Sequence, residues 1–353
     1  MRDLSICAKR ARGRTTSRLI PFVVATGGLL LALSGVSDAR SPTLEEIKPK
    51  SGSTKGPGRT QSSRSGRPVV RLNPRPRRPA DRPAPTRVAV LAGTIGSTRL
   101  NFGGVEIEFT SIPGGEFIMG ALPTQSAADT DEKPAHRVRL SGFEIGVTEV
   151  TVGQFQAYCR ATGKEMPKQE RWNYSEYHPV HNVSWNDAVG YCKWATSELK
   201  RQGLPGSVRL PTEAEWEFAA RGGATGVGGK PRYKYPWGDR APTGASGLGN
   251  FEGNGDDDLR TAPVGQFKPT GYGLLDMAGN VWEWCQDRYD AGYYAKSPVE
   301  NPQGSDDSNN RLRILRGGSW RDSPLCASSR YWCLPGFRSH DLVGFRLART
   351  LRP

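Results

Sequence analysis

The chain has 353 residues, of which 36% are hydrophobic and 9% aromatic, so it has enough apolar material for a core and is not disordered throughout. Its net charge of +14 comes from one end, since residues 1–99 carry 20 basic and five acidic side chains and the remainder carries 29 and 30. The charge therefore does not indicate a nucleic-acid-binding domain. All nine tryptophans lie at or after Trp172, which places the folded body in the C-terminal part.

The first 39 residues have the pattern of an export signal. Six basic residues within positions 1–18 precede an apolar run at 19–33. That run is shorter than the roughly 20 residues that a membrane span needs. Ser37 and Ala39 supply the small residues of a cleavage site after Ala39. We predict a signal peptide at 1–39, with an uncleaved N-terminal anchor as the alternative. In either case we expect the body to be exported, to the periplasm or the extracellular space.

Residues 40–87 are predicted to be a disordered basic linker. This stretch contains nine prolines and no aromatic residue, so it cannot bury enough apolar surface to offset the entropy of folding. A solvated linker without a partner is the simplest interpretation. Contact with an anionic membrane or a cell-wall surface is the alternative.

Residues 88–353 form the predicted folded domain, in which Gly, Asn, Asp and Pro interrupt every short segment. Capping residues and apolar spacing predict helices from Thr151 or Val152 to Thr162, from Ser184 to about Lys200, and from Glu213 to Arg221 after the cap Thr212. The expected strands are Val105–Thr110, Gly115–Met119, His136–Leu140, Phe143–Thr148, Arg313–Gly317 and Gly344–Ala348. The sequence thus predicts an α+β domain rich in ordered loops.

Several longer strings in this domain carry a resemblance. They are Ile112–Gly120, Val147–Thr151, Val183–Ala188, Arg209–Gly223, Pro236–Gly238, Tyr272–Leu274, Gly279–Trp284, Arg316–Trp320 and Gly344–Arg346. Together and in this order they resemble the formylglycine-generating enzyme (sulfatase-modifying factor) family, from about residue 102 to the C-terminus. The resemblance implies a loop-rich variant of the C-type-lectin-like fold. It also implies a chemistry in which oxygen and copper oxidise a sulfatase cysteine to formylglycine.

The copper site of that family holds the metal between two cysteines, a donor pair that suits soft Cu(I). By the resemblance, the first cysteine falls on Asp322, and Cys326 lies one residue too close to be the second. Copper is therefore not expected here. Ser319 and Trp282 fall on the family's oxygen pocket. The candidate catalytic set is Ser319, Trp282, Asp322 and Cys326.

Calcium is the ligand that the resemblance supports better, because carboxylate and carbonyl oxygens on a turn-rich chain suit a hard cation. A first structural site is expected at Asn250, Phe251, Asp256 and Asp257, although the spacing leaves open which aspartate binds. A second is expected at Asp276, the carbonyls of Gly279 and Val281, and Glu283. Solvated aspartates in a loop are the alternative for the first site.

Five cysteines remain after signal removal, namely Cys159, Cys192, Cys285, Cys326 and Cys333. By the resemblance, Cys192 and Cys333 match halves of two family disulfides whose partner positions are Leu347 and Ala220 here, so neither disulfide can form. Cys285–Cys326 is the favoured pair in an exported protein. Buried free thiols are the alternative. Because five is odd, at least one thiol stays free or pairs between chains.

Several other patterns are interpreted as structural. The solitary Arg-Gly-Gly strings at 221–223 and 316–318 indicate turns rather than RNA-binding units. Among Glu213, Glu215 and Glu217, only the first and last share a side of the expected helix. His178 and His181 are predicted to be loop or cap residues. Most of the tryptophans are assigned to the core, and a pocket role is left open for Trp282.

The expected function is that of an exported accessory, maturation or ligand-binding protein that lacks the standard copper chemistry. Its partner would be a client protein, a peptide or a small molecule, and no specific nucleic acid is expected. The alternative is an oxidoreductase of the family. That enzyme would oxidise either a small molecule, such as a siderophore chromophore, or a sulfatase cysteine.

Overall fold

The computed structural model describes residues 96–351, apart from 122–127, 174, 224–225, 227–234, 239–246, 253–259, 323–329 and 334–340. The predicted signal peptide and linker, together with Asp256, Asp257 and Cys326, lie outside these described residues. Within them, no helix has the length and apolar character that a bilayer span requires.

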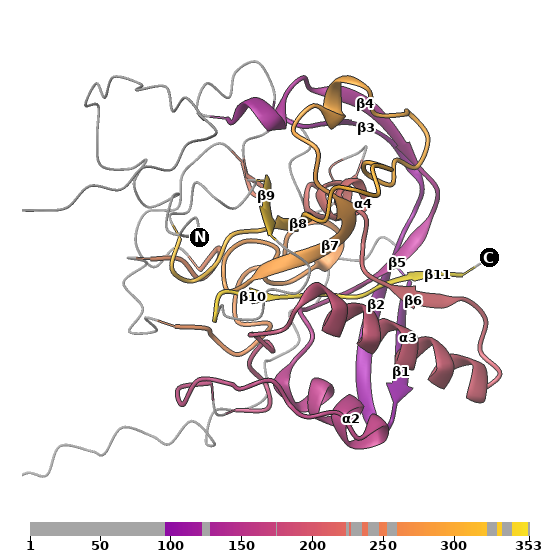
Figure 1. The fold of residues 1–353 in the computed structure, drawn as a ribbon, viewed down its shortest axis with the longest axis vertical. Helices are drawn as coiled ribbons and strands as arrows, with labels where there is room; N and C mark the ends of the chain where they lie inside the picture. Colours follow the sequence, from indigo (N-terminus) through magenta and orange to yellow (C-terminus); the bar gives the residue numbers. More distant parts are fainter. Residues whose placement is uncertain are drawn as a thin grey trace, which may run out of the picture. The chain divides into compact units, whose positions relative to one another are not determined.

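The largest sheet is antiparallel and has the strand order β1-β2-β5-β11-β6. Its strands are β1 (Ser97–Phe102), β2 (Val105–Ile112), β5 (Phe143–Gly146), β6 (Ser207–Arg209) and β11 (Ala348–Thr350). Helix α2 (Val152–Thr162) packs against β2, and helix α3 (Trp185–Arg201) packs against β1 and β6. Figure 1 shows both helices beside this sheet.

A second sheet has the order β10-β7-β8-β9, with β10 parallel to β7 and the other pairs antiparallel. Its strands are β7 (Trp282–Arg288), β8 (Arg313–Arg316), β9 (Arg330–Cys333) and β10 (Val343–Gly344). Strands β3 (Gly115–Met119) and β4 (His136–Leu140) form a separate antiparallel pair. Helix α4 (Glu213–Ala220) contacts β3, β7 and β8. Three short 3-10 turns, η2 (Thr130–Glu132), η3 (Gly271–Gly273) and η4 (Tyr293–Ala295), lie in the connections.

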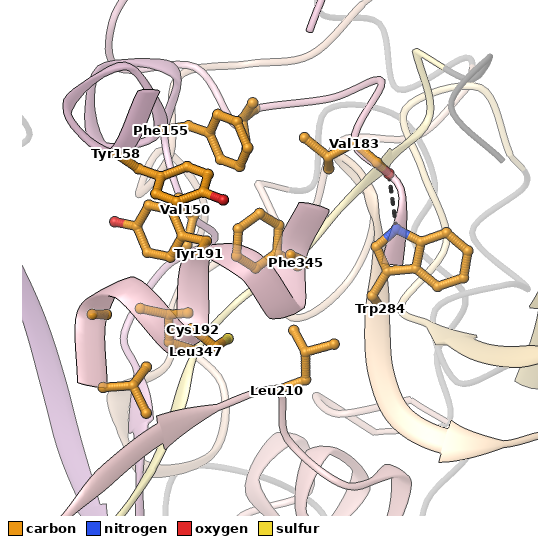
Figure 2. Packing of buried hydrophobic residues seen from close by; sticks show 14 of the residues in the cluster. Val150, Phe155, Tyr158, Val183, Tyr191, Cys192, Leu210, Trp284, Phe345 and Leu347 are labelled. Carbon is orange, nitrogen blue, oxygen red and sulfur yellow. Dashed lines mark hydrogen bonds between the residues drawn. The ribbon is translucent and has the colours of Figure 1, made fainter. Parts of the chain in front are cut away.

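Strand β7 separates two apolar clusters, and this fixes which way its side chains point. Trp282 and Trp284 belong to a cluster with Phe155, Tyr191 and other aromatic residues of α2 and α3, part of which Figure 2 shows. Cys285 belongs to the other cluster, around α4. The indole nitrogen of Trp284 donates to the carbonyl of Val183 at 2.9 Å, which ties β7 to the segment before α3.

All three helices begin at the residues that the sequence indicated. Thr151, Ser184 and Thr212 each accept a hydrogen bond from the backbone three residues later, and each capping box is complete. Gly163 ends α2 in the left-handed conformation, with φ of 68°. These predictions are confirmed because caps are local and need no tertiary information.

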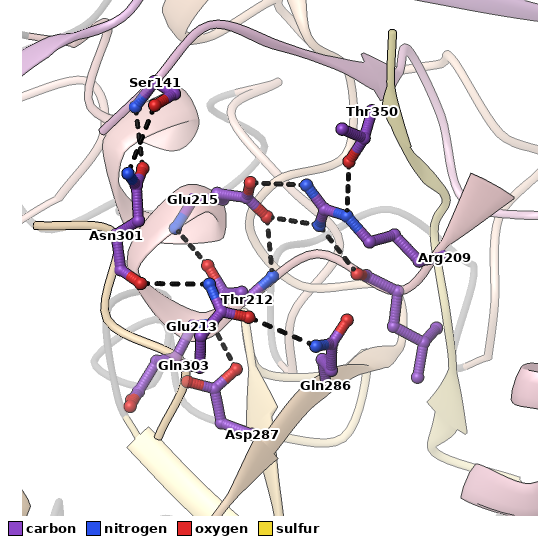
Figure 3. A network of polar contacts seen from close by, with 11 residues as sticks. Ser141, Arg209, Thr212, Glu213, Glu215, Gln286, Asp287, Asn301, Gln303 and Thr350 are labelled. Carbon is purple, nitrogen blue, oxygen red and sulfur yellow. Dashed lines mark hydrogen bonds and ion pairs between the residues drawn. The ribbon is translucent and has the colours of Figure 1, made fainter. Parts of the chain in front are cut away.

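The start of α4 is held by a polar network that Figure 3 shows. Arg209 makes two hydrogen bonds to Glu215, at 2.6 and 2.7 Å, and the backbone amide of Glu213 donates to Asp287 at 2.8 Å. On another side of the helix, Glu213 and Glu217 both pair with the buried guanidinium of Arg316. The prediction that only Glu213 and Glu217 share a helix side is therefore confirmed.

The turn interpretation of the two Arg-Gly-Gly strings is also confirmed. All four of their glycines have φ between 67° and 100°, in the region that favours glycine. Arg221 and Arg316 are buried, at 4% and 1% exposure, so neither guanidinium is available to a nucleic acid. Trp216, Trp282 and Trp284 are fully buried, and Trp185 and Trp320 pack against the first cluster.

Two predictions are wrong. The expected strand 344–348 is divided between β10 and β11, because the intervening Arg346 directs its side chain to Glu283 and to three carbonyls instead of continuing a ladder. The favoured Cys285–Cys326 disulfide is absent, since Cys285 is a free, buried thiol, as are Cys159 and Cys192. Cys285 faces the α4 cluster, whereas the loop after Ser319 contacts the opposite side of β7 through Trp282.

Candidate functional site

The structure brings three of the four candidate catalytic residues together at one carboxyl group. Asp322 Oδ2 accepts hydrogen bonds from Trp282 Nε1 at 2.8 Å, from the Ser319 backbone amide at 3.1 Å, and from the Ser319 hydroxyl. The Asp322 amide in turn donates to the Ser319 carbonyl at 3.1 Å, which closes a turn after β8. Cys326, the fourth residue, lies outside the described residues.

Burial governs the protonation of Asp322. The side chain is 2% exposed, and loss of solvation raises its pKa to about 6 from 3.8, because burial penalises the charged form. The hydrogen bonds from Ser319 and Trp282 act in the opposite direction and keep the pKa from rising further. The group is thus a buried acid that titrates close to neutrality.

A copper ion held by two thiolates does not fit at Asp322. This residue offers a hard carboxylate where Cu(I) prefers a soft sulfur donor. Its Oδ2 already accepts three hydrogen bonds, all from Trp282 and Ser319. The residues that resemble the family's oxygen pocket are therefore held by a hydrogen-bonded carboxyl group.

Next to this turn lies an aromatic group that the sequence did not indicate. The Trp320 ring packs edge-on against Trp172, with centroids 5.7 Å apart, and the exposed Arg260 lies 5.7 Å from the centre of the Trp172 ring. His181 packs on Trp172 at 5.1 Å and is fully buried. Both nitrogens of His181 lack a hydrogen-bond partner, and burial lowers its pKa to about 4, so the ring is neutral at pH 7. His178 and His181 lie in a loop, as predicted.

The loops around the turn are joined by backbone hydrogen bonds. The amide of Gly279 donates to Gly317, the amide of Trp320 to Asn280, and the amide of Asn280 to Asn250, each at 2.9 Å. The segment that holds the predicted second calcium site therefore lies directly beside the Ser319 turn. Asn280 has φ of 61°, a left-handed conformation that asparagine tolerates.

Asp276 and Glu283, the predicted carboxylate ligands of that site, have different surroundings. Asp276 is buried, its Oδ2 accepts from the Gly265 amide at 2.5 Å, and its Oδ1 has no hydrogen-bond partner. Glu283 instead binds Arg346 through both oxygens, at 2.6 and 2.7 Å, and also accepts from Trp216 at 2.7 Å. Asp276 fits a cation-binding role, whereas both Glu283 oxygens are committed to other partners.

Glu149 is a residue whose role the sequence did not indicate, although it lies in the quoted string Val147–Thr151. It is 1% exposed, and burial raises its pKa well above the usual value, with the charges of Asp276 and Glu283 acting in the same direction. Burial likewise raises the pKa of Asp276 to about 6, and hydrogen bonding with Glu149 lowers it. Glu149 and Asp276 therefore form a buried acid pair.

The predicted first calcium site is only partly described, because Asp256 and Asp257 lie outside the described residues. Asn250 is fully buried, and its Oδ1 has no hydrogen-bond partner. Its Nδ2 donates to the Arg260 carbonyl at 2.6 Å. Phe251 is buried against Trp237. Over the described ranges, no group of three or more His, Cys, Asp and Glu side chains is arranged to hold a metal.

Comparison with known proteins agrees with this geometry. The family model for the sulfatase-modifying factor enzyme 1-like domain matches residues 105–351. The solved structure of PvdO from Pseudomonas aeruginosa is similar with a TM-score of 0.61 and 28% identity, over 74% of this chain and 100% of that chain. The fold is thus α+β, the loop-rich C-type-lectin-like variant of formylglycine-generating enzymes.

The chain belongs to the formylglycine-generating enzyme (sulfatase-modifying factor) family. It is 35% identical to the formylglycine-generating enzyme of Streptomyces coelicolor over 271 residues, which are 62% of this chain and 79% of that protein. It is also 32% identical, over 60% of this chain and 74% of the relative, to a mouse protein named inactive C-alpha-formylglycine-generating enzyme 2.

Proposed function

We propose that this chain is an exported member of the family that binds a client protein, a peptide or a small molecule, and that it acts as an accessory or maturation protein without copper-dependent formylglycine chemistry. The observation that carries this proposal is the state of Asp322. Where the resemblance places a copper-binding thiolate, a carboxyl group binds Trp282 and Ser319 instead. Cu(I), a soft metal ion, would therefore lack one of the two thiolate ligands that it requires at this position.

Two further observations support a binding role. Trp172 and Trp320 lie only partly buried beside the Ser319 turn, with the exposed Arg260 over Trp172, which is a surface suited to stacking and to charge-assisted contacts. The mouse relative is named an inactive enzyme, which supports a role for this chain that does not depend on the standard activity.

Export rests on the predicted signal peptide at 1–39. The basic linker at 40–87 would then extend the domain from its point of attachment, or from the cell surface, and would favour anionic lipid or cell-wall polymer by charge alone. Expression of the full chain followed by cell fractionation would test this part. Recovery of the chain only inside the cell would contradict it.

The first experiment is a direct assay for formylglycine. The purified chain is incubated with Cu(I), oxygen and a peptide containing Cys-x-Pro-x-Arg, and the peptide is then examined by mass spectrometry. We expect the cysteine to remain unchanged, because the pair of soft donors is missing. The Streptomyces coelicolor enzyme serves as the positive control under the same conditions. Conversion of the cysteine to an aldehyde by this chain would overturn the proposal.

A second candidate function is oxidation of a small molecule. Trp282 and Ser319, which resemble the family's oxygen pocket, are both present and both donate hydrogen bonds to the buried carboxyl group of Asp322. In such a reaction dissolved oxygen would accept the electrons that the bound small molecule gives up. Oxygen uptake with candidate substrates would detect it. Loss of that uptake in Ser319→Ala would favour this candidate over the binding role.

A further inference from the structure

An exposed arginine lies over an indole ring beside the Ser319 turn. The guanidinium carbon of Arg260 is 5.7 Å from the centre of the Trp172 ring, and Trp320 packs edge-on against Trp172 with ring centroids 5.7 Å apart. Both tryptophans are only partly buried, and Arg260 is exposed. We call Trp172, Trp320 and Arg260 the Trp172 surface, because together they present two aromatic rings and a cation to solvent.

The backbone beneath the Trp172 surface is fixed by buried polar contacts. The carbonyl of Arg260 accepts a hydrogen bond from Asn250 Nδ2 at 2.6 Å, and the next residue, Thr261, donates its hydroxyl to Asn173 Oδ1 at 3.2 Å. Thr261 and Asn173 are each 2% exposed, and they directly follow Arg260 and Trp172 in the chain. One buried hydrogen bond thus joins the two segments that carry the cation and the ring.

The two indole rings are also held in place. Trp320 Nε1 donates to the carbonyl of Asp341 at 3.2 Å, and the Trp320 amide donates to the carbonyl of Asn280 at 2.9 Å. The Trp172 ring packs on the fully buried ring of His181, with centroids 5.1 Å apart. Because these contacts restrict both rings before any ligand arrives, binding would cost little side-chain entropy.

The guanidinium of Arg260 is open to a ligand. Within the described part of the chain, no acidic side chain or backbone carbonyl pairs with it. Arg313 provides the contrast, because it lies 3.8 Å from the centre of the Trp185 ring but is partly buried and donates to the carbonyl of Gln286 at 2.7 Å. That stacked arginine is part of the fold, whereas the stacked Arg260 leaves its donors directed to solvent.

A guanidinium beside two indoles selects the chemistry of its ligand. Its planar fork of N–H donors matches the two oxygens of a carboxylate, and its charge repels a cation. The indole rings attract another planar ring. A carboxylate attached directly to an aromatic ring offers both features in one rigid molecule, so little ligand flexibility is lost on binding.

We propose that the Trp172 surface binds a small planar molecule in which an aromatic ring carries a carboxylate. The carboxylate pairs with Arg260, and the ring packs against Trp172 and Trp320. This inference rests on the proposed function, because it names the class of ligand for the binding role. It involves neither a metal ion nor the buried acids.

Isothermal titration of the full chain with three matched probes tests this assignment. Naphthalene-2-carboxylate has the ring and the charge, naphthalene-2-carboxamide has the ring alone, and cyclohexanecarboxylate has the charge alone. We expect the first probe to bind at least about tenfold more tightly than either of the others, because a charge-assisted hydrogen bond and an aromatic contact each contribute roughly that factor.

Two variants assign the two contacts to residues. Arg260→Gln should weaken the binding of naphthalene-2-carboxylate by at least about tenfold and remove its advantage over the carboxamide. Trp172→Leu should remove its advantage over cyclohexanecarboxylate. Arg137→Gln is the matched control, because it removes the same charge from an exposed arginine on β4 and should leave all three affinities unchanged. Circular dichroism establishes that each variant is folded.

The assignment is wrong if naphthalene-2-carboxylate binds no more tightly than the other two probes. It is equally wrong if Arg260→Gln binds this probe like the wild type. Either result together with an unchanged cysteine in the formylglycine assay would reject this class of ligand and leave the proposed function standing. Oxidation of the Cys-x-Pro-x-Arg peptide would reject the proposed function itself, whatever the probes show.

Discussion

Replacing Arg346 by methionine is expected to lower the free energy of unfolding by about 3–5 kcal/mol, because Glu283 would be left as a buried charge without its partner. The two side chains meet through two hydrogen bonds, at 2.6 and 2.7 Å, and both are essentially inaccessible to solvent. The substitution also removes the donors to three backbone carbonyls. Urea unfolding followed by tryptophan fluorescence would measure the change.

Two comparisons separate charge from geometry in this prediction. Arg346→Lys keeps the charge but loses the planar fork, so it should still be clearly destabilising. The double variant Arg346→Met with Glu283→Leu should recover part of the loss, because no unpaired charge remains. Arg99→Met removes an exposed pair with Glu108 and should change stability by less than about 1 kcal/mol. An Arg346→Met chain as stable as the wild type would show that this pair is not structural.

The pairing of Glu283 with Arg346 also shows the limits of inference from sequence. Both residues lie within strings that carry the family resemblance, but they are 63 positions apart, and nothing in their spacing indicates a contact. Glu149 and Asp276 are separated even further. A resemblance transfers the role of a position, whereas the partner of a buried charge depends on how the loops pack in this particular chain.

Local signals performed better than long-range ones. The predicted caps Ser184 and Thr212 are correct because a capping box involves only residues three apart. Strand β7 was not anticipated, since both of its faces are buried and its sequence shows no alternation of polar and apolar residues. Strands β1 and β6 were missed as well, and β6 is only three residues long.

Within the candidate site, the sequence identified Ser319, Trp282 and Asp322, and the structure brings all three together. The neighbouring His181 was assigned to a loop, and nothing in its sequence context indicated that both ring nitrogens would be buried without partners. Trp172 and Trp320 come from distant segments, so only the folded chain reveals their contact.

When the pH is raised from about 4 to about 7, the wild type should lose up to about 3 kcal/mol of stability relative to the variant Asp322→Asn. The pKa of Asp322 is 3.8 as its ordinary value and about 6 in the folded chain, so the folded state holds the proton more tightly than the unfolded state. The contribution of this group to stability is complete below pH 3.8 and is lost as the pH rises to about 6. At higher pH this contribution does not change further. Asparagine does not titrate and can still accept the hydrogen bonds from Trp282 and Ser319.

Urea midpoints measured at half-unit pH steps for both proteins would reveal this difference, and the contributions of all other groups cancel in the subtraction. Ser319→Ala provides an internal check, because the Ser319 hydroxyl lowers the pKa of Asp322. Without that hydrogen bond, the pKa of Asp322 in the folded chain should rise, so the fall in stability should continue to a higher pH while still beginning near pH 3.8. Parallel profiles for the wild type and Asp322→Asn would mean that folding does not raise the pKa of Asp322 above its ordinary value of 3.8. The carboxyl group beside Trp282 would then be ionised in the folded chain at neutral pH.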